Sequence, residues 1–72
     1  MRFIRVKLAV APMSQLVGFT GFAYLSIGSG TIAEVVEYEE DRCRVIYLGG
    51  TDATVQASAQ KFLADVGATV VI

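Results

Sequence analysis

A run without charged side chains, from Leu8 to Ala33, constrains the fold of this 72-residue chain more than any other feature. A membrane-spanning helix needs about 20 predominantly apolar residues, so the length of the run would allow one. Glycine and polar side chains are scattered through it, however, at Ser14, Gln15, Gly18, Thr20, Gly21, Ser26, Gly28, Ser29, Gly30 and Thr31. Because the segments on both sides also alternate like strands of a sheet, we expect no membrane span.

The same run could instead form a glycine-rich phosphate loop or split into two packed elements. Its glycines do not follow the G-x-G-x-x-G spacing, and no lysine accompanies them. The pattern favours a short helix over residues 12–21, with Pro12 in its first turn, followed by a long strand from about Phe22. Gly28 to Gly30 would form a bulge or bend in that strand, because glycine accepts backbone conformations that other residues resist.

Length and composition predict a single domain, residues 1–72, that associates with other chains. The core of so small a domain supplies roughly 3–5 kcal/mol, while 54% of the residues are hydrophobic and mean hydropathy is +0.57. We therefore expect a homo-oligomer, or a module that docks on a larger protein partner. The net charge of −1 argues against nucleic-acid binding. With no histidine and one cysteine, the chain lacks the ligands for a conventional zinc or haem site, and we expect neither metal nor cofactor.

The first residues alternate between basic and apolar side chains, which is typical of a strand. The alternation predicts a strand over residues 2–11 whose core-facing side chains are Ile4, Val6, Leu8 and Val10. A signal peptide would instead have a basic cluster followed by an uninterrupted apolar segment. The single thiol of Cys43 also fits the reducing cytoplasm, where we expect the protein to reside.

The carboxyl-terminal part predicts one amphipathic helix and a final strand. Val55, Ala59, Phe62, Leu63 and Val66 have the spacing of one helix face, which predicts a helix over residues 52–66. Thr51 or Asp52 would cap its first turn, and Gly67 would end it in the left-handed conformation. The sequence ATVVI that follows predicts a terminal strand.

Residues 31–48 predict a hairpin, because two β-branched and aromatic segments flank a charged turn. If Tyr38 lies opposite Cys43, Glu37 faces Arg44 and apolar residues face one another. In that register one face carries Ala33, Val35, Ile46 and Leu48. The other face, which we predict to be an interface, carries Val36, Tyr38, Val45 and Tyr47.

The predicted order of elements is strand, helix, strand, strand, helix, strand. This is the ferredoxin-like βαββαβ fold of the α+β class, a four-stranded antiparallel sheet with two helices on one face. The other sheet face would remain open to a partner.

Residues 25–72 resemble the NIL domain, a ferredoxin-like regulatory module, and more distantly the ACT modules of similar architecture. The resemblance rests on Ile27, Gly30, Ile32, Leu48, Gly50, Ala59, Leu63, Gly67 and Val70. It implies a regulatory domain whose ligand is a small metabolite, such as an amino acid.

Few residues suggest catalysis, and we do not expect an enzyme. The acidic residues between Glu34 and Asp41 are interpreted as solvated charges at the hairpin tip. Cys43 is interpreted as a structural thiol, and no histidine is present to activate a serine.

Two functions remain open. One is a homo-oligomeric regulatory module that binds a small metabolite near a subunit interface, at the bend formed by Ser26, Ile27, Gly28, Ser29 and Gly30. The other is a structural or adaptor subunit that assembles without ligand or catalysis. A binding module should possess a pocket in which polar groups converge.

Overall fold

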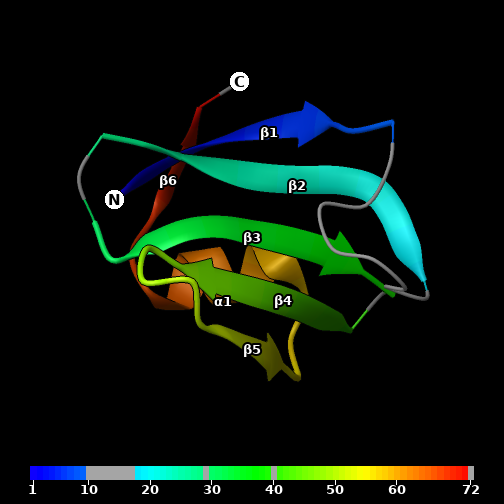
Figure 1. Cartoon of the computed structure of the whole chain (residues 1–72). Coiled ribbons are helices and arrows are strands. Elements are labelled where there is room, and N and C mark those ends of the chain that lie inside the picture. Colours follow the sequence, from blue (N-terminus) through cyan, green and yellow to red (C-terminus); the bar gives the residue numbers. More distant parts are fainter. Residues whose placement is uncertain (10–17, 29, 40, 72) are drawn as a thin grey trace.

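The structure, a computed structural model, describes residues 1–9, 18–28, 30–39 and 41–71. Its elements, shown in Figure 1, are β1 (Arg2–Lys7), β2 (Phe19–Ile27), β3 (Ile32–Tyr38), β4 (Arg42–Tyr47), β5 (Asp52–Val55), α1 (Ala59–Asp65) and β6 (Thr69–Val71). These elements differ in number and kind from the predicted fold.

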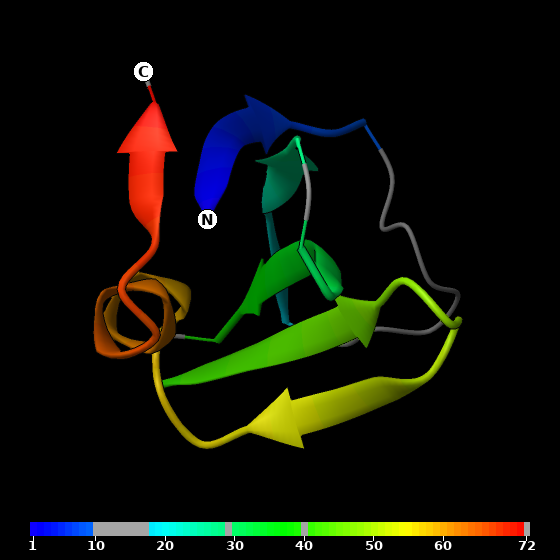
Figure 2. The ribbon, with the colours of Figure 1, turned by 90° about the vertical axis from the view of Figure 1, so that its left-hand side faces the viewer.

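All six strands belong to one mixed sheet with the order β5-β4-β3-β2-β1-β6. The first five strands pair antiparallel with their neighbours in sequence, and β6 then pairs parallel with β1. The ferredoxin-like prediction of four antiparallel strands and two helices is therefore wrong. The sheet curls, so that α1 lies at the opening between β6 on one side and β4 and β5 on the other (Figure 2).

The predicted helix over residues 52–66 is two elements, the edge strand β5 and the shorter helix α1. Residues 52–55 pair with β4, where Thr54 and Val55 fit the pleated sheet better than a helix. The N-cap of α1 is Ser58, whose Oγ accepts a hydrogen bond of 3.1 Å from the backbone N–H of Lys61. Gly67, at φ +74°, ends the helix as predicted, because the N–H of Ala68 bonds to the carbonyl of Leu63.

The predicted helix over residues 12–21 is wrong where the structure describes it. Gly18 lies in a turn, and Phe19 to Gly21 already belong to β2, while residues 12–17 lie outside the described residues. The register of β2 on β3 shifts between Phe19 and Ala23, and Gly21 has a φ of +97° there. The bulge thus comes earlier than the one predicted at Gly28 to Gly30. Gly28 and Gly30 instead lie between β2 and β3.

The predicted side-chain directions of the first strand are inverted. Phe3 is fully buried against the core, whereas Ile4, predicted to face the core, is 37% exposed. The strand β1 also ends at Lys7, earlier than the predicted residue 11, and residues 10 and 11 lie outside the described ones. Alternation gave the period correctly, but both sets of alternate side chains include apolar groups, so it could not identify the face that the helix covers.

The hairpin exists, but its predicted register is wrong by one residue. Tyr38 pairs with Arg42 and Val35 with Val45, so the connecting turn is one residue shorter than expected. Glu39 begins this turn at a φ of +54°. A slip of one residue moves a side chain to the other face, so Val45 and Val36 do not share a face.

The main core cluster lies between the sheet and α1, while Ala23, Val36 and Tyr38 are buried on the other side of the sheet. We call the side of the sheet that packs on α1 the helix face and the opposite side the outer face. The buried core cluster consists of Phe3, Tyr24, Ile32, Val35, Cys43, Val45, Ala59 and Leu63. Ala59 and Leu63 point inward as the helical spacing predicted, and Cys43 is fully buried, as expected for a structural thiol.

Candidate functional site

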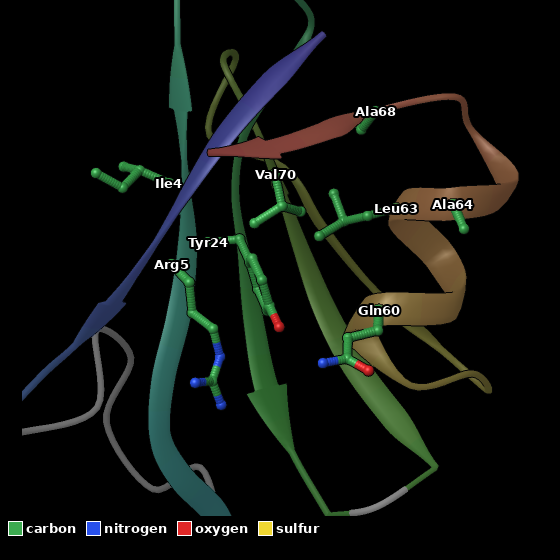
Figure 3. A pocket seen from close by; sticks show the side chains of 8 residues that line it. All are labelled: Ile4, Arg5, Tyr24, Gln60, Leu63, Ala64, Ala68 and Val70. Atoms are coloured by element: carbon green, nitrogen blue, oxygen red, sulfur yellow. The ribbon is translucent and has the colours of Figure 1, made fainter. Parts of the chain in front are cut away.

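A groove with a volume of about 690 Å³ lies between α1 and the sheet. We call it the helix groove (Figure 3). It is lined by Ile4, Arg5, Tyr24, Gln60, Leu63, Ala64, Ala68 and Val70. Its volume lies within the range of roughly 300–1,000 Å³ that is typical of small-molecule sites.

Strand register brings the groove residues together on the helix face. Arg5 pairs with Tyr24 across β1 and β2, and Phe3 pairs with Val70 across β1 and β6. Directly paired residues point to the same side of a sheet, so these four side chains face α1. The side chain of Ile4 points away from the helix (Figure 3), as expected for the residue between Phe3 and Arg5.

One end of the helix groove is apolar. Leu63 and Ala64 of α1 form one wall, while Val70 of β6 and Ala68, just before it, form the other. Val70 is 36% exposed, so the apolar lining is accessible. The turn at Gly67 reverses the chain between the two walls and thereby holds them on opposite sides of the cavity.

The other end is polar and is organised around Arg5. Its guanidinium carbon lies 3.7 Å from the centroid of the Phe22 ring and 6.0 Å from that of Tyr24, which places the cation over two aromatic faces. Its Nη2 atom lies 3.6 Å from Oε2 of Glu37. The hydroxyl of Thr20 in turn donates a 3.1 Å hydrogen bond to Oε1 of Glu37. The amide of Gln60 and the phenol of Tyr24 point toward the same end of the groove (Figure 3).

A second hollow of about 320 Å³ adjoins the helix groove. Its lining residues are Thr20, Glu37, Glu39, Ser58, Ala59 and Gln60. Gln60 belongs to both cavities, and the pair formed by Arg5 and Glu37 lies where they meet. The two carboxylates of this hollow are engaged by neighbours, because Glu39 also lies 3.8 Å from Nε of Arg42.

The groups with shifted pKa values lie outside the helix groove. Burial raises the pKa of the Cys43 thiol to about 11, which keeps it in the unreactive neutral form. Burial also raises the pKa of Glu34, which lies on the outer face because it pairs with Leu25 and Ile46. Within residues 1–9, 18–28, 30–39 and 41–71, no three His, Cys, Asp or Glu side chains form a cluster that could hold a metal ion.

The described residues among those predicted to bind a ligand lie at the carboxyl-terminal end of β2 and in the connection that follows it. Ser26 and Ile27 are the last residues of β2, and Gly28 and Gly30 belong to the connection to β3. Ser29 lies outside the described residues. None of the other four lines the helix groove or the second hollow, and their role as a ligand site stays a prediction.

The predicted interface residues do not form one exposed surface. Val36 and Val45 have no exposed area, Tyr38 is 7% exposed and Tyr47 is half-buried. Val45 packs in the core cluster with Tyr47 beside it, whereas Val36 lies on the other side of the sheet, paired with Arg44. These four residues therefore do not share an open face, while homo-oligomerisation itself stays a prediction.

Sequence reasoning missed Arg5 and Gln60, the two polar groups from opposite walls of the helix groove. Arg5 is one of the basic residues that alternate with apolar ones at the start of the chain, and Gln60 lies outside the apolar spacing that predicts the second helix. A signal was present for Arg5, because a buried Phe3 places the next alternate residue on the core side. Nothing comparable marks Gln60, whose position depends on where α1 begins.

Comparison with known proteins found no match, since no family model fits the chain and neither a curated protein nor a solved structure is similar to it. In the part of the chain that the structure describes, no helix is long and apolar enough to cross a membrane. The geometry of the helix groove is therefore the basis for a functional assignment.

Proposed function

We propose that the protein is a small binding module, and that a small amphipathic molecule occupies the helix groove. The observation that carries the proposal is the division of one cavity into an apolar end, formed by Leu63, Ala64 and Val70, and a polar end at Arg5. Small-molecule sites combine such apolar walls with a few convergent polar groups that orient the ligand.

The polar groups of the groove suit binding better than catalysis. A guanidinium, an amide and a phenol come from Arg5, Gln60 and Tyr24. These groups orient a ligand by hydrogen bonds. The buried thiol of Cys43 belongs to the core cluster and is not among the residues that line the groove.

The position of the groove between two parts of the fold supports a regulatory role. A molecule held there contacts α1 together with β1, β2 and β6. Its binding would hold the helix against the sheet, and a ligand that binds only the folded state raises stability by mass action. Such a ligand could thereby alter the association of the module with a partner or with a second copy.

Octanol, a neutral amphiphile, and its charged relatives octanoate and octylamine are suitable minimal probes. We expect at least one to shift backbone amide signals of α1 and β6 in an NMR titration of the isotope-labelled chain. Ala64→Trp should abolish these shifts, because Ala64 is exposed on the groove wall and the indole would fill the cavity. The control Lys61→Trp changes an exposed helix position that does not line the groove. If none of the three probes shifts groove amides at millimolar concentration, the proposal is wrong.

A second candidate is a structural or adaptor subunit that assembles with itself or with a larger partner. The observation that favours it is the apolar surface of the outer face, where Ile4 and Ile27 are each 37% exposed and Leu25 is half-buried between β1 and β3. Gel filtration with light scattering tests it. Assembly would give a species larger than 7.7 kDa that Ile27→Asp dissociates, and a monomer at micromolar concentration would contradict it.

A further inference from the structure

The guanidinium of Arg5 defines the chemistry of the group that the polar end of the helix groove can accept. We infer that the ligand is an amphipathic carboxylate, whose carboxylate binds Arg5 and whose apolar body lies against α1 and β6. This inference rests on the proposed function and narrows it to one class of ligand.

Arg5 is held in place but retains hydrogen-bonding capacity. Stacking on Phe22 at 3.7 Å restricts the guanidinium, so little further entropy is lost when an anion binds. Its contact with Glu37 at 3.6 Å exceeds hydrogen-bonding distance. Among the described residues its side chain donates no hydrogen bond, and it is 40% exposed, so the donors are open to a ligand.

The lining of the helix groove favours an anion over an amine, because its charged residue is Arg5. The carboxylate of Glu37 already accepts a hydrogen bond from Thr20 and faces Arg5, while Glu39 faces Arg42. An ammonium group in the helix groove would meet the cationic Arg5 among its lining residues. A carboxylate would instead receive two parallel hydrogen bonds from the guanidinium, a geometry that arginine matches well.

Gln60 and Tyr24 supply neutral groups beside the same site. The side-chain amide of Gln60 and the hydroxyl of Tyr24 point toward the polar end in Figure 3, from the opposite wall and from the sheet respectively. Both can donate to a carboxylate oxygen that Arg5 does not use. The apolar body would then extend past Leu63 toward Val70.

The test compares octanoate, octanol and octylamine, which share one apolar chain and differ in the charge of the head group. NMR titration of the labelled chain at neutral pH gives the dissociation constant of each. We expect octanoate to bind about tenfold more tightly than octanol, because charge-assisted hydrogen bonds are the stronger ones. Octylamine should bind more weakly than octanol.

Arg5→Met and Arg2→Met form a matched pair for the same titrations. Both remove one positive charge from β1 and leave an apolar stem, but Arg2 pairs with Ile27 on the outer face. Arg5→Met should remove the preference for octanoate while octanol binding is retained. Arg2→Met should keep the preference, and circular dichroism checks that both variants fold.

The outcomes separate this inference from the proposed function. If octanol and octanoate bind the helix groove equally well, or octylamine binds best, the carboxylate assignment is wrong and the binding function stands. If Arg2→Met removes the preference as completely as Arg5→Met, the effect is one of net charge and the assignment to Arg5 is wrong. If no compound binds, the proposed function fails together with the inference.

Discussion

The two faces of the sheet differ in what covers them, although neighbouring residues of the same strands supply both. Tyr24, Val35 and Val45 form a row on the helix face and are 1%, 0% and 0% exposed. The adjacent row on the outer face contains Leu25, Glu34 and Ile46, which are all half-buried. Apolar content alone does not distinguish the rows. The row that faces α1 is fully buried, and the helix groove lies on that face.

The largest expected effect comes from placing the same polar residue on each face in turn. Val45→Asn leaves an unsatisfied polar group in the core, which lowers the free energy of unfolding by about 1–3 kcal/mol. It also loses the burial of a valine, which lowers the free energy of unfolding by a further amount of about 1.5–3 kcal/mol. The sum approaches the whole stability of a domain this small, so we expect this variant to be largely unfolded. Ile46→Asn, one residue along and half-buried on the outer face, should stay folded. Urea denaturation followed by circular dichroism measures both, and equal losses would show that the faces are not distinct.

A smaller effect is expected from weakening the start of α1, which covers the helix face. Ser58→Ala removes the 3.1 Å N-cap hydrogen bond to Lys61. We expect a loss of about 1 kcal/mol, which lowers the melting temperature by roughly 4–8 °C. Ser58→Asn keeps a capping acceptor and should retain most of the stability. If the alanine and asparagine variants melt together, the helix does not begin at Ser58.

The smallest effect distinguishes two glutamates of β3 that lie on opposite faces. Burial raises the pKa of Glu34, whose Oε2 atom is buried and makes no hydrogen bond to a described residue. The folded state therefore holds this proton more tightly than the unfolded chain, and stability falls as pH rises through the raised pKa. Glu34→Gln should increase the melting temperature near pH 7 by less than about 5 °C. The gain should vanish when the pH falls below the ordinary pKa of 4.5.

Glu37→Gln is the matched control for that experiment. Glu37 lies on the helix face, where it accepts a hydrogen bond from Thr20 and faces Arg5. Neutralising it weakens these contacts, so the melting temperature at pH 7 should fall slightly or stay unchanged. A gain of equal size in both variants would contradict the assignment of the two side chains to different environments.

The sequence predicted local features more reliably than pairings between distant segments. The hairpin, the end of α1 at Gly67 and the inward direction of Leu63 follow from nearby residues and are confirmed. The register of the hairpin depends on the length of the turn at Glu39, and an error of one residue there wrongly placed Val45 and Val36 on the same face. The sequence did not predict the short strand β5, because Val55 also fits the spacing of the predicted helix over residues 52–66.

The candidate site was harder to predict than the fold. The helix groove joins Arg5 near the start of the chain with Gln60 and Val70 near its end, which come together through the parallel pairing of β1 with β6 and the packing of α1 against β3, β4 and β6. No local pattern in the sequence encodes that pairing. The bend at Gly28 to Gly30 was predicted as a ligand site because closely spaced glycines are easily recognised in a sequence. The helix groove instead depends on common residue types that tertiary packing brings together.

The most direct test of the central claim is to measure which face of the sheet a bound amphiphile contacts. Intermolecular nuclear Overhauser effects between octanoate and the labelled protein report contacts with individual methyl groups. We predict contacts from the octyl chain to Leu63, Ala64 and Val70 of the helix groove. Contacts to Leu25 and Ile27 on the outer face, with none to the groove, would contradict the account.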